Sequence, residues 1–303
     1  MRESHRPGAR ARTAARVAVS QLNARDIALK ESAGWHTQPA TVIFWPGPPL
    51  HVIYMGMGQS LALHRHYATQ ISISLGAPLR MRIHASKPFT EQQSFVVGSD
   101  IPHQVETLGV PSIGFWSEAR TLATFARRLR AASASELPAL PSDLLSALVP
   151  AIRTFWGQVL DEAAGQALLS HILTTLLGPG LPDQSPDDPR IASALSQVTP
   201  EFLVEQPQPI SSLAAHVHLS PSRFRHLFRS EMGMSVQSYL RWQRLFVALR
   251  TSVDGASLTE AAHTAGFADS AHLTRVFRAT FGLPPSHIFK NSHFIQVMLS
   301  TAC

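Results

Sequence analysis

Short hydrophobic runs separated by turn residues fill the chain from Ala40 to about Trp116. The runs are rich in β-branched and aromatic residues, and they read TVIFW, HVIYM, QISIS, LRMRIH, SFVVG and SIGFW. The segments between them contain PGPP, GMGQ, GAP and GSDIP. Short strands bounded by such turns are typical of an antiparallel all-β unit. The pattern predicts a sandwich or a barrel.

The pattern changes at Glu118, after which apolar residues recur at helical spacing to about Leu177. We expect two or three helices here, interrupted by prolines, that offer a surface for pairing with a second subunit. A proline-rich acidic stretch from Gly178 to Pro189 is unsuited to a core and predicts a linker. The predicted organisation is a basic arm (1–37), a β unit (38–118), a helical dimerisation or connecting segment (119–177), the linker (178–189), an all-α DNA-binding domain (190–290) and a tail (291–303).

Two similar helix pairs stand out in the last third of the chain. In the first, Leu213, Ala214 and Val217 form the apolar stripe of a short helix, and Leu219 closes a turn. Ser220 is then a natural N-cap, followed by proline at the first helical position, and Gly233 ends the second helix. The inward residues of that helix, at helical spacing, are Phe224, Leu227 and Phe228.

The second pair repeats the first about 49 positions later, with a turn one residue longer. Small residues again form the packing stripe, Gly266 and Phe267 make the turn, and Asp269 caps a helix that ends at Gly282. A continuous helix from about Val236 to Ser252 is predicted between the pairs. Two short helices joined by a tight turn, with a basic outer face on the second, describe a helix-turn-helix unit.

Charge and composition agree with a DNA partner. Residues 207 to 303 hold 9 Lys/Arg against 4 Asp/Glu, whereas residues 32 to 206 hold 10 against 13. A basic segment with seven further histidines suits a surface that meets a polyanion. No apolar run approaches the roughly 20 residues of a membrane span, and the one cysteine, Cys303, allows no intrachain disulfide. We therefore expect a soluble cytoplasmic, nucleoid-associated protein without a membrane partner.

Residues from about Ile210 to Phe289 closely resemble the AraC/XylS family of transcription regulators, most specifically in "LSPSRFRHLFRSEMGMSVQSYLRWQRL" and "AGFADSAHLTRVFRATFGLPPSHIF". The resemblance implies base-reading residues at Ser222, Arg225 and His226 in the first unit and at Ala271, His272 and Arg275 in the second. Spacing along the outward helix faces agrees, and arginine is the side chain best suited to a bidentate contact with guanine. Arg223, Arg229 and Arg278 are expected to contact phosphates, and Arg244 to make a structural ion pair. A solvated helix face is the competing interpretation of these arginines.

The β unit carries a possible ligand or metal site. The sequence from Gly58 resembles a first cupin motif, with His64, His66 and with Gln70 where the usual metal site has Glu, and His103 stands like the histidine of a second motif. Three imidazoles converging in a barrel would suit Zn, Fe or Ni. The same residues would also suit an effector pocket without metal, or purely structural hydrogen bonds.

These patterns predict an α+β fold with an N-terminal cupin-like antiparallel β-barrel, then helices, then an all-α domain with two helix-turn-helix units. The expected function is that of a non-enzymatic transcription regulator that binds promoter DNA, is controlled by a small effector in the barrel, contacts RNA polymerase and forms a homodimer. The alternative is a metal-dependent, dioxygenase-like cupin enzyme fused to a DNA-binding domain, but no nucleophile motif or phosphate-binding glycine loop supports catalysis.

Overall fold

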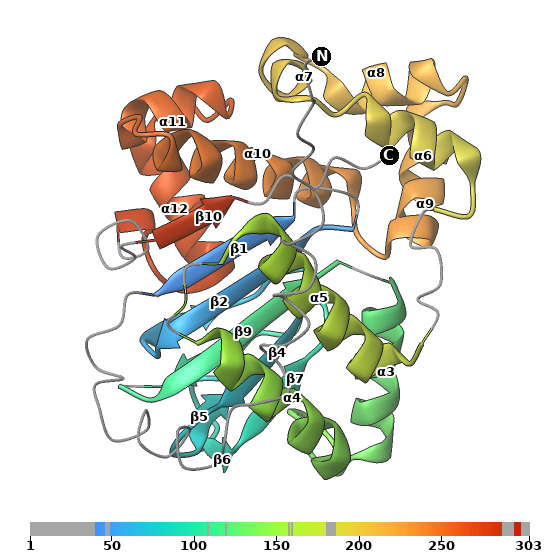
Figure 1. Cartoon of the computed structure of the whole chain (residues 1–303). Coiled ribbons are helices and arrows are strands. Elements are labelled where there is room, and N and C mark those ends of the chain that lie inside the picture. The colour runs from blue at the N-terminus through green and yellow to red at the C-terminus, as the bar shows by residue number, and fades with distance from the viewer. Residues whose placement is uncertain are drawn as a thin grey trace, which may run out of the picture. The chain divides into compact units, whose positions relative to one another are not determined.

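The computed structural model describes residues 40 to 286 with short gaps, together with residues 294 to 297 (Figure 1). The gaps are residues 46–48, 108, 119, 157, 159 and 180–185. The predicted arm at 1–37 and residues 298 to 303 of the predicted tail, with Cys303, lie outside the described residues. Among the described helices, none is long and apolar enough to cross a bilayer.

The β unit consists of two sheets. The six-stranded sheet has the order β10-β1-β2-β9-β4-β7, and the four-stranded sheet has the order β3-β8-β5-β6. Their strands are β1 (Thr41–Trp45), β2 (His51–Met57), β3 (Ser60–His64), β4 (Thr69–Ser74), β5 (Leu79–Arg82), β6 (Thr90–Gln92), β7 (Ser94–Val97), β8 (His103–Glu106), β9 (Pro111–Ser117) and β10 (Phe294–Val297).

All six hydrophobic runs singled out in the sequence form strands, which confirms the antiparallel β unit. Strands β3, β6 and β8 were not predicted as runs because they are short and carry polar residues. The pairings among the described residues make two sheets and no single closed ring, so the barrel stays a prediction. Strand β10, from the predicted tail, pairs in parallel with β1, from Thr41 opposite Phe294 to Phe44 opposite Val297.

Three helices follow the β unit, as predicted: α3 (Arg120–Ala132), α4 (Ser142–Phe155) and α5 (Glu162–Leu177). Figure 1 shows α4 and α5 beside the six-stranded sheet. Beyond the linker come α6 (Pro189–Ser196), α7 (Pro200–Glu205), α8 (Pro209–His216), α9 (Pro221–Met232), α10 (Val236–Val253), α11 (Leu258–Thr264) and α12 (Ser270–Phe281). The two predicted helix pairs are α8–α9 and α11–α12, joined by α10.

The two helix pairs lie in different hydrophobic cores. The first pair packs with α6, α7 and the beginning of α10 around Phe224 and Phe228, which are almost fully buried. The second pair shares its core with the β unit, because Val42, Phe44 and Val52 of β1 and β2 belong to the same buried cluster as its helices. The Phe44 and Phe246 rings, for example, meet edge to face at 5.5 Å. The second pair is therefore seated on the sheet through apolar contacts, the dominant favourable contribution to such packing.

Candidate nucleic-acid interface and ligand cavity

Helix α9 is built to present its polar face outward. The Ser220 hydroxyl accepts a hydrogen bond from the Arg223 backbone N–H at 3.3 Å, and Gly233 ends the helix in the left-handed conformation, with φ +71°. Both caps were predicted. With Phe224 and Phe228 held in the core, the three predicted base-reading residues lie on the exposed side of the helix: Ser222, Arg225 and His226.

Helix α12 repeats this construction. The Asp269 carboxylate accepts from the His272 N–H at 2.6 Å, and Gly282 ends the helix with φ +77°. The turn before the helix is one residue longer than in the first pair, as predicted. Ala271 and Arg275 are exposed, whereas His272 is half-buried and rests edge to face on the Phe267 ring at 5.4 Å. A histidine held in this way has a restricted approach to a base.

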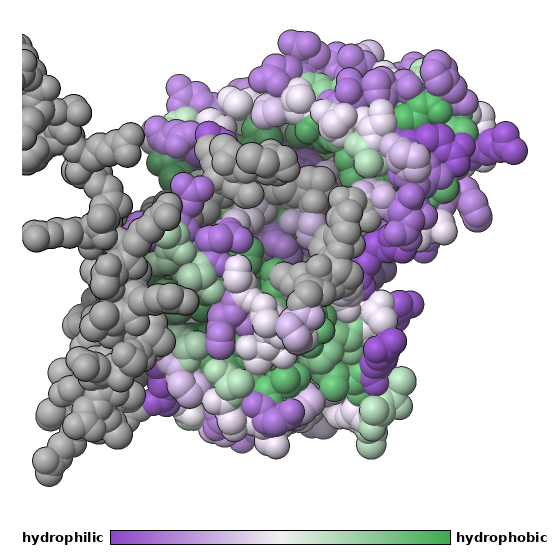
Figure 2. All heavy atoms as spheres, turned by 45° about the vertical axis from the view of Figure 1, so that its right-hand side comes forward, coloured by the Kyte–Doolittle hydropathy of each residue, from purple (hydrophilic) through white to green (hydrophobic). Residues whose placement is uncertain are grey.

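The three predicted phosphate-contacting arginines, Arg223, Arg229 and Arg278, are exposed. Within the part of the chain that the structure describes, neither they nor Arg225 and Arg275 form an ion pair within 4.0 Å. Hydrophilic residues are prominent on the upper right of the surface view, over the region of the first helix pair (Figure 2). These guanidinium groups are available to a polyanion, and their contacts with DNA stay a prediction.

The ion pair predicted for Arg244 was wrong. Its Nη2 donates instead to the Leu203 carbonyl oxygen at 2.9 Å, at the end of α7. A helix C-terminus carries partial negative charge on its free carbonyls, so it attracts a cation without needing an acidic side chain. Arg244 thus ties the connecting helix to α7.

A polar cleft lies between the two helix pairs, with α10 as its floor. Arg225 lines it from the first pair and His272 from the second, and Arg241 and Arg244 line it from α10. Among the residues that the structure describes, no acidic one lines this cleft. Sequence reasoning missed Arg241, which is exposed, because it lies on the connecting helix rather than on a reading helix. The arrangement joins the two predicted reading surfaces through a strip of positive charge.

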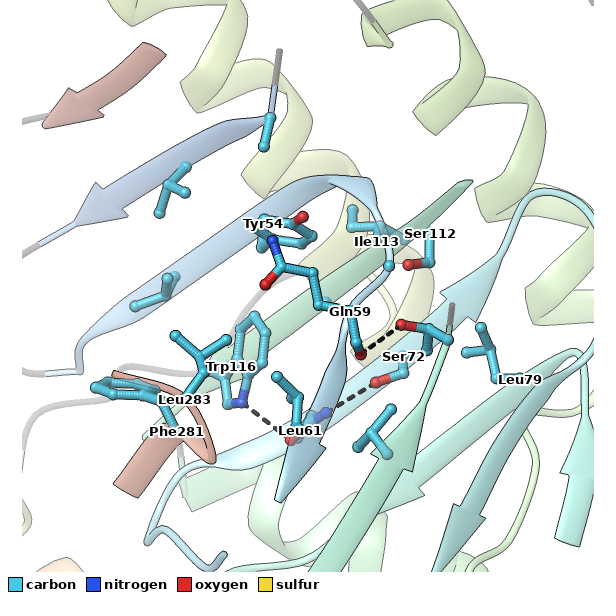
Figure 3. Close-up of a pocket in the computed structure, with 18 of the residues that line it drawn as sticks. Tyr54, Gln59, Leu61, Ser72, Leu79, Ser112, Ile113, Trp116, Phe281 and Leu283 are labelled. Atoms are coloured by element: carbon cyan, nitrogen blue, oxygen red, sulfur yellow. Dashed lines mark hydrogen bonds between the residues drawn. The ribbon is translucent and has the colours of Figure 1, made fainter. Parts of the chain in front are cut away.

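A second, largely apolar cavity lies between the strands of the β unit and the helices α10 and α12, and it has a volume of about 120 Å³. Figure 3 shows Trp116, Leu61 and Gln59 around it, with Phe281 and Leu283 from the end of α12. None of the described residues that line it is charged. Polar groups in its wall bond to one another, as when Trp116 Nε1–H donates to Gln70 Oε1 at 3.0 Å. The contribution of α12 to this wall was not predicted.

The structure brings the predicted histidines together. The rings of His64 and His103 have centroids 4.2 Å apart, and those of His66 and His103 5.0 Å apart, all three being buried. Burial lowers the pKa of each below its usual value, for His64 to about 4, because a charged imidazole loses its hydration there. At neutral pH the cluster is therefore uncharged. The Gln70 side chain lies 2.8 Å from His66 Nε2 and 2.9 Å from His103 Nε2, and Trp116 Nε1–H donates to His66 Nε2 at 3.2 Å.

Two further buried titratable groups had no sequence signal. His51, stacked on Phe115, has a pKa lowered by burial to about 4. Glu118 follows β9 and accepts a hydrogen bond from the Leu50 N–H at 3.4 Å, while its Oε1 has no hydrogen-bond partner. Burial raises the pKa of Glu118 to about 8. The sequence shows only that Glu118 stands where a β pattern gives way to a helical one.

Comparison with known proteins decides what the helix pairs are. Residues 213–291 match the family model described as a helix-turn-helix domain. The arabinose operon regulatory protein of Salmonella typhimurium is 30% identical over 148 residues, which cover 45% of this chain and 52% of the relative. The corresponding protein of Escherichia coli is also 30% identical over 148 residues, covering 50% of its length. Residues 213–291 of this chain are thus a helix-turn-helix domain, similar in sequence to these regulatory proteins.

The likeness outside the helix-turn-helix domain is one of fold. A variant of ToxT from Vibrio cholerae superposes with a TM-score of 0.50 at 10% identity, over 81% of this chain and 98% of that one. The arrangement of sheets followed by an all-α region is thus shared with a solved structure. The chain spans about half the length of the curated relatives it matches.

Proposed function

We propose that this protein is a sequence-specific, DNA-binding transcription regulator of the AraC type, controlled by an effector bound in its β unit. The observation that carries the proposal is the pair of capped helices α9 and α12, each with an exposed arginine one turn from its N-cap region. An arginine in the major groove reads guanine through two parallel hydrogen bonds. The matched helix-turn-helix family and the regulator relatives favour this function over a cupin enzyme.

The test is a competition gel shift with the full chain, after an operator has been selected from random duplexes. Replacing Arg225 or Arg275 with Ala is expected to cost about 1 to 3 kcal/mol at one base pair, and to relax the preference there. An unchanged ranking of every operator variant would remove that arginine from the set of reading residues. Failure of the wild-type chain to select any sequence would contradict the function itself.

Arg229 is predicted to contact a phosphate, so its replacement should act differently from that of Arg225 or Arg275. Arg229→Ala is expected to weaken binding to all duplexes alike and to lower the slope of log K against log salt by roughly 1, because one phosphate contact is lost. The Lys87→Ala variant, at an exposed position between β5 and β6, serves as the control for net charge. A sequence-dependent loss in Arg229→Ala would instead make it a reading residue.

The effector is proposed to be an uncharged, lipophilic small molecule held in the cavity below α12. The supporting observation is the wall itself, which has no charged residue and includes Phe277, Phe281 and Leu283. A ligand there touches the sheets and the second helix pair at once. If the ligand binds more tightly when the second helix pair is packed on the sheets than when it is not, it shifts the equilibrium between these two states toward the packed one.

A neutral naphthylamine dye is expected to bind this cavity with enhanced fluorescence, and a carboxylated analogue at least tenfold more weakly, because no cation in the wall offsets the desolvation of its charge. Ile113→Trp, which fills the cavity from β9, should abolish the signal. Equal binding of both dyes, or binding that survives Ile113→Trp, would contradict this ligand class.

Pairing and location complete the proposal. We infer a homodimer through the helices α3 to α5, contact with RNA polymerase at the promoter, a cytoplasmic, nucleoid-associated location and no catalytic activity. Sedimentation of the purified chain over a range of concentrations tests the dimer, and a monomer at all concentrations contradicts it.

A further inference from the structure

The connecting helix α10 carries a row of polar side chains along the cleft between the two helix pairs. Gln237, Arg241 and Arg244 line the cleft and follow one another at intervals of four and three positions, which places them on one side of the helix. Other sides of α10 are turned to the hydrophobic cores, where Trp242 and Leu245 are buried. The row therefore forms the floor of the cleft, and the reading residues of α9 and α12 do not account for it.

The positive charge of the cleft is not balanced by neighbouring carboxylates. Within the described ranges, Arg225, Arg241 and Arg244 form no ion pair. Arg244 is half-buried, and this burial lowers the pKa of its guanidinium group below the usual value, because the charge has lost part of its hydration. A partly desolvated cation without an acidic partner favours an incoming anion, which replaces the lost hydration.

Arg244 is held at a fixed place in the floor of the cleft. Its Nη2 donates to Leu203 O at 2.9 Å, and its Nε is buried without a hydrogen-bond partner among the described residues. The turn of the second helix pair reaches the same point, since a Cβ atom placed on Gly266 would lie 2.9 Å from Leu203 O and 3.4 Å from Arg244 Nε. A guanidinium group has five N–H donors, so Arg244 keeps donors for an acceptor in the cleft.

The cleft lies where a DNA backbone has to pass if both helix pairs bind one duplex. Helix α10 has 18 residues, which makes it about 27 Å long at about 1.5 Å per residue, and Figure 1 shows it running between the two pairs. Successive major-groove segments on one face of a duplex are about 34 Å apart. The backbones that border the minor groove cross that face between them, opposite the middle of α10, where Arg241 and Arg244 lie.

We propose that the cleft holds the sugar-phosphate backbone that crosses between the two reading helices, with Arg241 and Arg244 as its phosphate contacts. The cleft has a volume of about 600 Å³, and such a recess complements a projecting backbone rather than the inside of a groove. Phosphate contacts fix the register of a protein on the duplex without reading its sequence. The inference rests on the proposed function, since it requires both helix pairs to bind one duplex.

The experiment uses the full chain and the operator that it selects from random duplexes. Arg241→Gln is expected to weaken binding on the order of tenfold, because a charge-assisted hydrogen bond to a phosphate is lost. The slope of log K against log salt should fall by roughly 1, and the ranking of operator variants should stay the same. Arg250→Gln removes the same charge from an exposed position on the opposite side of α10, nine residues further on, and should bind like the wild type.

Neutral methylphosphonates, placed one at a time between the two half-sites, identify the phosphate that is contacted. At one position the neutral group should weaken the wild type about as much as Arg241→Gln does. It should have no further effect on Arg241→Gln, since both changes remove the same contact. Arg244→Gln, which keeps an N–H donor for Leu203 O, tests the second contact in the same way once thermal unfolding shows that the variant is folded.

The outcomes separate this inference from the proposed function. Equal affinities of Arg241→Gln and Arg250→Gln would overturn the inference, as would additive losses with every neutral phosphate between the half-sites. A loss in Arg241→Gln that depends on one base pair would make Arg241 a base-reading residue and would overturn its phosphate contact. In each of these cases a wild-type chain that still selects an operator leaves the proposed function standing. A wild-type chain that selects no duplex would contradict the proposed function, and the inference with it.

Discussion

Replacing Glu118 with Gln is expected to remove the loss of stability that this carboxyl group contributes between about pH 5 and pH 9, while the opposite contribution of the buried histidines below about pH 6.5 stays the same in both proteins. The pKa of Glu118 is about 8 in the folded chain against an ordinary value of 4.5. Between these values the folded chain holds a proton that the unfolded chain has released, so the free energy of unfolding falls as pH rises. A difference of this size corresponds to a loss on the order of 4 kcal/mol by pH 9, at 1.36 kcal/mol per unit.

Urea denaturation at pH 5 and pH 9 checks this prediction. The wild type should lose on the order of 4 kcal/mol more than Glu118→Gln across that range, since the amide keeps an oxygen for the Leu50 N–H and has no charge to bury. Glu162→Gln, at an exposed position in the first turn of α5, is the matched control and should behave like the wild type. Parallel pH profiles for the wild type and Glu118→Gln would contradict the assignment.

Gly282→Ala is expected to loosen the second helix pair from the β unit. The added Cβ would lie 2.8 Å from Ala62 O and 2.9 Å from Leu61 Cβ, besides 2.7 Å from His64 Nδ1. Two of these atoms are backbone or next to it, so the segment must shift. Strain at positive φ costs about 1 kcal/mol or more, and the overpacking adds typically 1 to 3 kcal/mol.

Gly233 supplies a control within the same chain. It ends α9 in the same way as Gly282 ends α12, with φ +71°, but a Cβ there meets nothing within 4 Å. Gly233→Ala should therefore show the backbone strain alone. Hydrogen exchange at the Ala62 amide, which donates to Gly282 O, should accelerate in Gly282→Ala and not in Gly233→Ala. Equal stability losses and equal exchange in the two variants would show that this contact does not hold the helix pair in place.

The elements of the helix-turn-helix domain were predictable because their signals are local. Ser220, Asp269 and the two C-cap glycines mark helix ends within a few residues, and each acts as its sequence context indicates. The histidines were also found from spacing, although their shared contact with Gln70 Oε1 depends on how three strands meet. No local sequence signal indicated that Arg241 lines the cleft or that Gln59 lines the cavity.

Contacts between distant segments were not predictable in this way. Phe281, at the end of α12, lines a cavity in the β unit, and no local pattern in the sequence indicates this. In the sequence, Glu118 is a polar residue at the point where a β pattern gives way to a helical one. Its burial depends on segments that are distant in the sequence. The same holds for Gly282, whose left-handed φ was predicted from the helix end but whose close approach to β3 was not.

The parallel strand β10 has a mechanical consequence. The helical region leaves the β unit through the linker before α6 and returns to it as β10, which is hydrogen-bonded to β1. A loop anchored at both ends explores far less space than a chain end tethered once, and it returns quickly after a partial opening. Regulation in such a molecule is expected to proceed by small displacements of a helical region that stays attached to the β unit at both of its ends.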